Sequence, residues 1–334
     1  MIYFTGDTHG DMVDLYDRLS NISLTDDDIL IILGDAGFNY HCNDKDKIIK
    51  EDAKRNIRAR IFCIHGNHEA RPQTISTYMQ TEFYGGKVYF EPDYPNLLFA
   101  VDGERYYFPM GQKTISVLTI GGAYSIDKYY RIQHGWKWFA DEQPDQVKKD
   151  EIIASIVENN EVNLVLTHTC PLEWQPTHLF LPQIDQSKVD KSTETFLSEV
   201  KSKLKYDYWL FGHFHGSEQI TDKAKMLFRG VLSLEQIFVG SDSMNPIICF
   251  IKENSRGYNY PISSSQISAA FNVSGIEIRK RINEARCAGE PICSCSNGYF
   301  YSEKEEDIKR TIDSLQGRIM KQENAISGLK SRLV

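Results

Sequence analysis

Aspartate, histidine and asparagine residues recur in this sequence just after short apolar runs. The stretch IYFTGDTHGD, residues 2–11, carries Asp7 and His9 directly behind such a run. Later runs lead in the same way into Asp35, Asn67 with His68, His168, and His213 with His215. Carboxylate, imidazole and amide oxygen donors together suit Mn, Fe, Zn or Mg-type cations rather than a thiolate metal site. One such residue alone is usually a turn residue, but the whole set indicates a metal centre.

The apolar runs before these residues are predicted to be buried strands. They cover residues 2–5, 29–33, 61–64, 116–120, 163–167, 208–211 and 246–251, and helical patterns cover 12–19, 45–59 and 147–158. Short apolar runs separated by helices are typical of a layered α/β domain. Residues 81–111, rich in Gly, Pro and Tyr, are expected to form hairpins and loops. In such domains ligands bind at the carboxyl ends of the strands, where neighbouring glycines let side chains approach closely.

Length, cysteine content and charge narrow the class of protein. The 334 residues suffice for one large and one small domain, and we expect them to span 1–250 and 251–334. Seven cysteines without a C-x-x-C pair argue against a disulfide framework and a zinc ribbon. The net charge is −8, yet residues 251–334 carry 13 Lys and Arg against 10 Asp and Glu, so a polyanion partner would bind there. The sequence shows neither a basic leader nor an apolar stretch of bilayer length, and a soluble, cytoplasmic protein is expected.

The pattern of the C-terminal part differs from that of the first 250 residues. Helical patterns at 263–271 and 276–289 precede two strand-like runs joined by Asn297-Gly298. An Asn-Gly pair between two such runs is a strong hairpin signal. Helix, turn, helix and hairpin is the order of a winged helix-turn-helix, so a small winged-helix domain is expected here.

A long helix is predicted at the C-terminus. Its apolar positions alternate in steps of four and three, with one polar exception: Ile308, Ile312, Leu315, Ile319, Gln322, Ile326, Leu329 and Leu333. This spacing is a heptad seam, which favours a coiled-coil homodimer through residues 308–333. A single helix that covers its own small domain is the alternative.

The five site segments resemble the signature blocks of the calcineurin-like metallophosphoesterases. The matching motifs, in order and spacing, are Gly6-Asp7-Thr8-His9-Gly10, Gly34-Asp35, Gly66-Asn67-His68-Glu69, Thr167-His168 and Gly212-His213-Phe214-His215. The resemblance covers roughly residues 1 to 240. It implies an α/β fold, a β-sandwich flanked by helices, with a two-metal centre at one edge.

The same resemblance implies roles for the matching residues. One metal would be held by Asp7, His9 and His215, the other by Asn67, His168 and His213, with Asp35 bridging both and His68 facing the substrate. A hydroxide between two divalent ions, Mn²⁺ in first place with Fe, Zn or Mg as alternatives, would hydrolyse a phosphomonoester or phosphodiester. Physically, two adjacent cations need a shared anionic ligand, which a carboxylate supplies.

The sequence departs from the Ser/Thr phosphatase branch of this family at one motif. That branch has Asp-Arg-Gly shortly after the bridging Asp, whereas this chain has GDAGFNY with Phe38 at the acidic position. The usual phosphate-clamping Arg is missing, and Arg71 or Arg131 is the candidate substitute. Residues 121–144 resemble a segment of a small bacterial and phage branch, and Tyr124 is a candidate substrate contact. Packing as a core or lid is the alternative for this aromatic segment.

The C-terminal module resembles winged-helix DNA-binding units of phage and prophage proteins. In such units the second helix enters the major groove, which would bring Arg279, Lys280, Arg281 and Arg286 near DNA. Docking of a protein partner is the alternative. For the whole chain the alternatives are a DNA-binding regulator that uses the phosphoesterase fold as a scaffold, a nuclease, or a phosphoprotein phosphatase.

Overall fold

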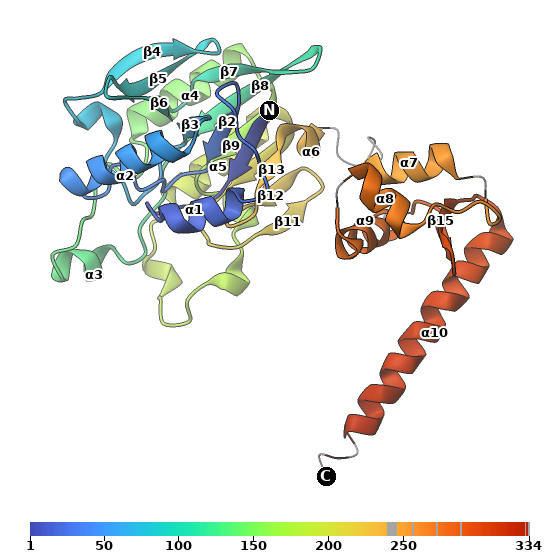
Figure 1. Ribbon diagram of the computed structural model, residues 1–334. Coiled ribbons are helices and arrows are strands. Elements are labelled where there is room, and N and C mark those ends of the chain that lie inside the picture. The colour runs from blue at the N-terminus through green and yellow to red at the C-terminus, as the bar shows by residue number, and fades with distance from the viewer. Residues whose placement is uncertain (239–245, 256, 272, 288, 331, 333–334) are drawn as a thin grey trace. The chain divides into compact units, whose positions relative to one another are not determined.

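The computed structural model describes residues 1–238, 246–255, 257–271, 273–287, 289–330 and 332 (Figure 1). The chain divides into two compact units, Met1–Phe238 and Val239–Val334. Each unit has a hydrophobic core of its own. The division falls after residue 238, twelve positions before the boundary expected from the sequence.

Two β-sheets form the centre of the first unit. The seven-stranded sheet has the order β13(Leu232–Ser233), β1(Ile2–Thr5), β2(Ile29–Ile32), β3(Arg60–Cys63), β6(Tyr94–Ala100), β5(Gly86–Glu91), β4(Met79–Phe83). The six-stranded sheet has the order β11(Glu218–Thr221), β12(Ala224–Met226), β10(Lys205–Phe211), β9(Glu161–Thr167), β8(Lys113–Ile120), β7(Arg105–Met110). Strands β1, β2, β3 and β6 run parallel, as do β8, β9, β10 and β12, so each sheet gathers several strand ends at one edge.

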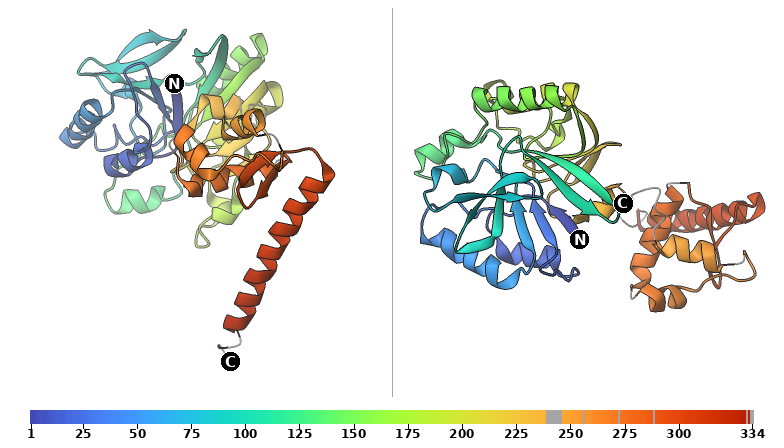
Figure 2. Two further views of the ribbon diagram at one scale, coloured as in Figure 1. Left: turned by 45° about the vertical axis from the view of Figure 1, so that its right-hand side comes forward. Right: turned by 90° about the horizontal axis from the view of Figure 1, so that it is seen from above.

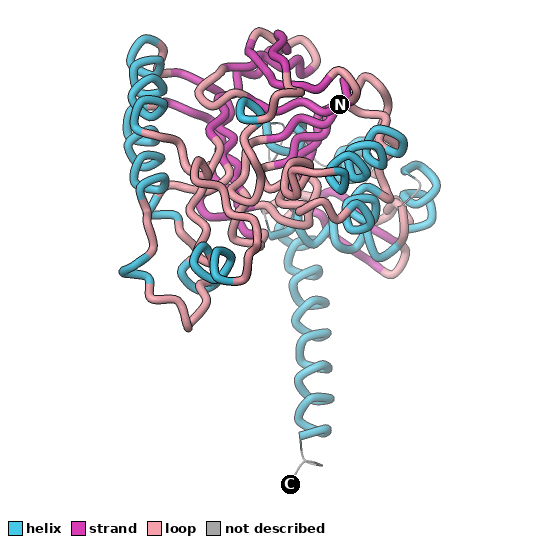
Figure 3. The backbone as a smooth tube through the Cα atoms, turned by 90° about the vertical axis from the view of Figure 1, so that its left-hand side faces the viewer, coloured by secondary structure: helices cyan, strands magenta, loops and turns pink. Residues whose placement is uncertain are grey.

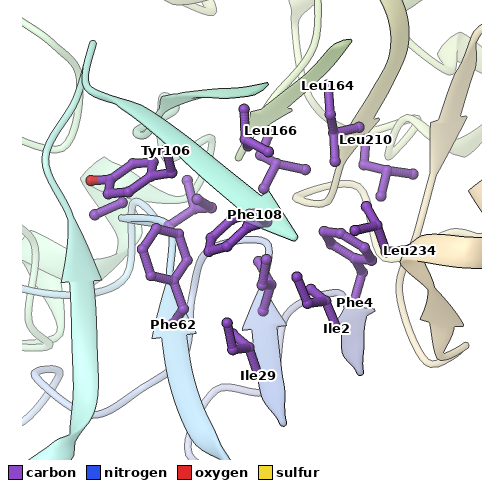
Figure 4. Close-up of a cluster of buried hydrophobic side chains, with 14 of the residues drawn as sticks. Ile2, Phe4, Ile29, Phe62, Tyr106, Phe108, Leu164, Leu166, Leu210 and Leu234 are labelled. Atoms are coloured by element: carbon purple, nitrogen blue, oxygen red, sulfur yellow. The ribbon is translucent and has the colours of Figure 1, made fainter. Parts of the chain in front are cut away.

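The main core lies between the two sheets (Figure 4). Phe4, Ile29 and Phe62 of the first sheet pack with side chains such as Phe108 and Leu210 of the second. The ring of Phe62 meets that of Tyr106 edge-on, with centroids 4.9 Å apart. Strands covered on both faces must be apolar throughout, which explains the continuous ILII sequence of β2.

Helices cover the outer face of each sheet. Helices α1(Met12–Leu19) and α2(Asp44–Asn56) pack on the first sheet, and α4(Gln146–Glu158) and α5(Ser192–Lys203) pack on the second. The view from above in Figure 2 shows α4 on one side of the strands and the two N-terminal helices on the other, and Figure 3 shows the strands between helices. The first unit is therefore an α/β sandwich flanked by helices.

Shorter elements complete the first unit. They are α3(Lys128–Gln133), α6(Leu234–Phe238) and the 3-10 turns η1(Pro72–Thr74), η2(Leu172–Trp174), η3(Thr177–Leu179) and η4(Gln186–Lys188). The hairpins and loops expected at 81–111 are strands β4 to β7 with their turns. None of the helices in the described ranges is both long and apolar enough to span a bilayer.

The second unit is mostly helical. Its elements are α7(Pro246–Asn254), α8(Ser264–Phe271), α9(Gly275–Cys287), the hairpin β14(Ile292–Cys295) and β15(Gly298–Tyr301), and α10(Glu305–Lys330). Its core contains Ile248, Ile267, Ile278 and Ile292. Helix α10 extends well beyond this core (Figure 1). The predicted seam position Leu333 lies outside the described residues.

The prediction of a strand at 246–251 is wrong. These residues form α7, whose Ile247, Ile248 and Ile251 are buried in the core of the second unit. Their spacing places all three on one face of a helix. A short continuous apolar run is compatible with either a buried strand or a buried helix, and here packing selects the helix.

Candidate metal centre

The predicted ligands all follow the carboxyl ends of parallel strands. Asp7 with His9, Asp35, and Asn67 with His68 follow β1, β2 and β3 of the first sheet. His168 follows β9 and His213 with His215 follows β10 of the second sheet. The sandwich brings these ends together, so both sheets contribute to one site.

The backbone at this site is held in an unusual conformation. His9, Asp35, His213 and His215 have φ values of 49°, 47°, 69° and 53°. Only six non-glycine residues in the described ranges have positive φ, and these four are among them. The left-handed region costs an L-residue roughly 1–2 kcal/mol. Strain of this kind concentrates at functional sites, where the surrounding structure enforces it.

Two glycines allow the strand ends to approach closely. A Cβ atom on Gly34 would lie 2.0 Å from Nδ1 of His168, and one on Gly66 would lie 1.9 Å from Oδ1 of Asp35. Neither position can carry a side chain while these ligands keep their places. The glycines next to the motif residues thus serve close approach, as the sequence predicted.

Asp7, His9 and His215 form the first cluster of ligand atoms. Their ligand atoms lie within 4.8 Å of one another. Oδ2 of Asp7 is 3.4 Å from Nε2 of His215 and 3.9 Å from Nε2 of His9, and those two imidazole nitrogens are 2.9 Å apart. Oδ1 of Asp7 accepts a hydrogen bond from the backbone N–H of His213, at 3.0 Å. Oδ2 is buried and accepts no hydrogen bond from any described residue.

Asp7, Asp35 and His168 form the second cluster, also within 4.8 Å. Nε2 of His168 lies 3.6 Å from Oδ2 of Asp35 and 2.9 Å from Oδ1 of Asn67. Nδ1 of His168 lies 2.8 Å from the carbonyl oxygen of Leu33, which it can donate to, leaving Nε2 free as a ligand. Asp7 is common to both clusters, and Oδ2 of Asp35 lies 3.9 Å from Nδ1 of His9 as well as 3.6 Å from Nε2 of His168. The shared role of Asp35 therefore stays a prediction.

The charges at the site are unbalanced without a cation. Burial opposes ionisation of Asp35, but the neighbouring His168 lowers the pKa of Asp35 well below its usual value. Burial likewise disfavours charge on His168, yet Asp35 and then Asp7 raise its pKa to about 9. Burial and the charge on His168 lower the pKa of His213 to about 3. A proton on His168 therefore offsets two buried carboxylates, and a bound cation would take over that role.

These residues fit divalent metal ions. The site offers carboxylate, imidazole and amide donors within reach of one another, and Oδ2 of Asp7 has no hydrogen-bond donor to satisfy it among the described residues. His213 is placed beside them, with its ring centroid 5.0 Å from that of His168. All seven predicted ligands are thus brought together.

His68 and Arg131 lie at the mouth of this site. The backbone N–H of His68 donates to Oδ1 of Asp35 at 2.8 Å. Arg131 places Nη2 3.5 Å from Nε2 of His68, while its Nε donates to Asp127 at 2.7 Å and its Nη1 to the hydroxyl of Tyr40 at 3.2 Å. Burial lowers the pKa of His68, and Arg131 adds to this effect, so the imidazole is mainly neutral at pH 7.

A cavity of about 620 Å³ opens next to the ligands and includes His68, Arg131 and Tyr124 in its lining. Part of its lining is apolar and is called the apolar wall here; it comes mainly from the segment between η3 and α5. The apolar residues are Leu179, Phe180, Leu181, Ile184, Val189 and Phe214. The rings of Phe180 and Phe214 are stacked at 6.2 Å. The sequence analysis did not find this wall, because its residues have no regular spacing.

Arg71 does not reach the site. Its guanidinium forms a buried ion pair with Asp102 at 2.6 Å and donates to the carbonyl of Asp141 at 2.6 Å, beside a different cavity. Of the two candidate clamps, only Arg131 lines the ligand cavity. Phe38, at the position of the missing acidic residue, is fully buried in the core under the first sheet.

Residues that support the ligands were also missed. Nδ2 of Asn67 donates to the hydroxyl of Ser125 at 2.9 Å, which fixes the amide so that its oxygen faces His168. Ser125 in turn donates to Glu142 at 2.5 Å, and the indole N–H of Trp138 donates to the same carboxylate at 2.9 Å. The aromatic segment 121–144 therefore contributes to ligand orientation. Only the contact between distant segments reveals this, since Ser and Glu are common surface residues.

The four predicted DNA contacts on α9 differ in availability. Arg279 and Lys280 are exposed. Arg281 is engaged along its own helix with Glu277 at 2.7 Å and Glu284 at 3.8 Å. Nε of Arg286 donates to the carbonyl oxygen of Ile292 in β14 at 2.7 Å, so this side chain is partly committed to the hairpin.

Comparisons with known proteins bear on the first unit. Two solved structures align with part of the chain. They are the phosphopantetheinyl hydrolase PptH from Mycobacterium tuberculosis (14% identity, 68% of this chain and 87% of that chain, TM-score 0.37) and the calcineurin-like phosphoesterase YfkN from Bacillus subtilis (13% identity, 69% and 82%, TM-score 0.27). At these TM-scores no conclusion about this chain rests on either likeness. No curated protein sequence matches the chain.

The family comparison covers the whole candidate site. Residues 1–217 match the family described as calcineurin-like phosphoesterase, and this span includes every predicted ligand from Asp7 to His215. Members of this family use divalent metal ions, for which the clusters described above offer the ligands. The chain therefore belongs to the calcineurin-like phosphoesterase family and is a phosphoester hydrolase.

Proposed function

We propose that the first unit hydrolyses a phosphate ester with two divalent cations held between its sheets. The observation that carries the proposal is the convergence of the buried Asp7, Asp35 and His168 with the exposed His9 and His215 on one site. Asp7, His9 and His215 would hold one ion, and Asn67, His168 and His213 the other, with Asp35 or Asp7 shared. Bound divalent cations neutralise phosphoryl oxygens and lower the pKa of water, which supplies the nucleophile.

We assign roles to His68, Arg131 and Tyr124 from their positions in the cavity. Arg131 stays charged at any working pH and lies next to His68, so the pair can stabilise negative charge on the leaving oxygen. The ion pair with Asp127 and the bond to Tyr40 fix the guanidinium in place. Tyr124 lines the same cavity and would contact the rest of the ester.

A dedicated phosphoprotein phosphatase is less well supported than hydrolysis of a smaller ester. The acidic partner of the substrate-facing His is replaced by Phe38, which is buried, and Arg71 is held by Asp102 away from the cavity. The apolar wall instead suits an ester with an apolar or planar leaving group. A nuclease or another phosphodiesterase stays within the proposal, and a screen of mono- and diesters separates them.

Asp35→Asn provides the test. This variant keeps the shape of the side chain but removes the charge, so we expect more than a 100-fold loss of activity. Changes outside the ligand sphere already cost about 10- to 100-fold. The measurement is Mn²⁺-dependent hydrolysis of p-nitrophenyl phosphate and of its bis-ester, together with the metal content of each protein.

Asp44→Asn is the matched control, because Asp44 is exposed on α2, where it forms an ion pair with the exposed Lys47. It should hydrolyse both esters as the unmodified protein does. Full activity of Asp35→Asn, or a metal-loaded unmodified protein that cleaves neither ester nor nucleic acid, would refute the proposal. In the second case a scaffold for a DNA-binding regulator becomes the better reading.

We further propose that the second unit binds DNA and pairs with a second copy of the chain. The order of α8, α9 and the hairpin and the exposed Arg279 and Lys280 support the first role. For the second role, Ile319, Ile326 and Leu329 of α10 are exposed by 54%, 51% and 70% on one heptad seam. Ile at one heptad position and Leu at the other favours a parallel two-stranded coiled coil. Binding of duplex DNA in EDTA distinguishes DNA binding from protein docking.

A further inference from the structure

A concave surface in the second unit collects three arginines. It lies among α9, the hairpin and α10 and encloses about 630 Å³. We call it the basic cleft and define it by Arg279, Arg286, Arg318, Ser294, Ser296 and Ser314, all of which line it. No Asp or Glu of the described residues lines this cleft. Arg318 and Ser314 come from α10, outside the helix-turn-helix that the sequence singled out.

Among the described residues, no carboxylate pairs with the arginines of the basic cleft, unlike other cations of the unit. Arg281 has Glu277 and Lys252 has Glu290, at 2.7 Å and 2.9 Å. Nη2 of Arg286 is buried and has no hydrogen-bond partner among the described residues. Burial and the nearby Arg318 both lower the pKa of Arg286. Positive charge in a concave, partly dehydrated place attracts an anion more strongly than the same charge on an open surface.

The donors in the cleft match a particular anion. Guanidinium groups present parallel N–H donors that suit phosphate oxygens, and serine hydroxyls add single donors. Nε of Arg286 donates to the carbonyl oxygen of Ile292, and Nε of Arg318 donates to that of Ser314 at 3.3 Å. The terminal nitrogens of both guanidinium groups are left for a ligand. We propose that the basic cleft binds a phosphate group, held by Arg279, Arg286 and Arg318 and by the surrounding serine hydroxyls. The phosphate can come from a nucleic-acid backbone or from a free nucleotide.

This inference deepens the proposed DNA-binding role, but it rests on the geometry of the second unit alone. The nucleic-acid phosphate would bind in the cleft rather than on the outer face of α9, and Arg318 would be one of its contacts. The experiment uses the full chain in EDTA, so that divalent ions are withheld from the phosphoesterase site. The probes are inorganic phosphate, AMP and a labelled DNA duplex, with affinity measured by calorimetry or anisotropy.

Arg279→Gln and Arg318→Gln are the test variants. The matched controls are Lys309→Gln and Lys321→Gln on α10, which are exposed and do not line the cleft. Arg286 is left intact because its bond to the hairpin makes folding a concern. Thermal melting should be the same for all four variants, and the two controls should hydrolyse p-nitrophenyl phosphate normally.

We expect at least one probe to bind, and its Kd to rise at least about tenfold in each test variant, since a charged hydrogen bond is lost. The Kd should stay within about twofold in the controls, whose charges are solvated. If the protein binds AMP but not the DNA duplex, the cleft is a phosphate site and the DNA-binding role is rejected. If all four variants weaken DNA binding equally, the second unit binds DNA but the cleft is not the phosphate site. Absence of binding by all three probes would reject both.

Discussion

Glu69 lies beside the candidate metal centre as a fully buried carboxyl group. Its Oε1 accepts a hydrogen bond from the backbone N–H of Gly66 at 3.0 Å. Its Oε2 is buried and has no hydrogen-bond partner among the described residues. Burial, with a further contribution from Asp35, raises the pKa of Glu69 from 4.5 to about 8. In the metal-free protein this residue therefore holds a proton at pH 7.

This pKa predicts how stability depends on pH. Between pH 4.5 and 8 the unfolded chain loses the proton of Glu69 while the folded protein keeps it. Unfolding then releases a proton, so the stabilisation present below pH 4.5 is lost as the pH rises to about 8. Urea unfolding in EDTA should show this fall, amounting to a few kcal/mol because one pKa unit is about 1.4 kcal/mol.

Glu69→Gln should flatten that part of the pH profile, because the amide does not titrate. Glu82→Gln is the matched control, since Glu82 is exposed on β4 and should leave the profile unchanged. If the free energy of unfolding depends on pH in the same way in Glu69→Gln and in the unmodified protein, Glu69 is ionised in the folded state.

Single elements differ in how far the sequence determines them. The helix predicted at 12–19 is α1 with the same ends, because Asp11 caps it through the N–H of Asp14 and its apolar residues share one face. The strands leading into the ligands were also predicted, since both faces of each are covered and the runs are apolar throughout. The run at 246–251 lacks such a distinguishing signal, and only its packing in the second unit makes it a helix.

Site residues that stand in motifs behind strands could be predicted from the sequence. Site residues whose role depends on contacts between distant segments could not. Asp7, His9, Asp35 and His168 stand directly behind strands, so parallel pairing within each sheet and the packing of the two sheets bring them together. The support of Asn67 by Ser125 depends on a fold of the loop after β8 that no local pattern encodes. The exclusion of Arg71 likewise depends on Asp102, a tertiary partner.

The segment between η3 and α5 is the element that should decide which esters bind. Phe180 stacks on Phe214 and lines the cavity. Phe180→Ala should raise KM for 1-naphthyl phosphate roughly fivefold, because an apolar surface for the leaving group is removed. KM for glycerol 2-phosphate, which has no aromatic group, should change little.

Leu172→Ala is the control for this prediction. Leu172 is an exposed apolar residue of η2, in the same connection between β9 and α5, but it does not line the cavity. An equal change of KM for both esters, or the same effect in the control, would show that the wall does not contact the leaving group.

At the scale of the whole molecule, α10 should determine the number of chains. Ile319→Asp places a charge on the heptad seam and should convert a dimer to a monomer in sedimentation velocity. Met320→Asp is the matched control, because Met320 is exposed by 60% on the same helix but lies off the seam. A monomeric unmodified protein, or a dimer that persists in Ile319→Asp, would exclude pairing through α10.

The residues of the first cluster come from opposite ends of the first unit in sequence, and His9 and His215 are 206 positions apart. During synthesis the N-terminal ligands leave the ribosome long before their partners exist. On the proposed ligand assignment, the nascent enzyme would stay inert until β10 has joined its sheet and delivered its two histidines, so catalysis would begin only once the sandwich has closed. For the same reason, a chain broken in the connection before β9 could regain activity only if its two pieces reassociated.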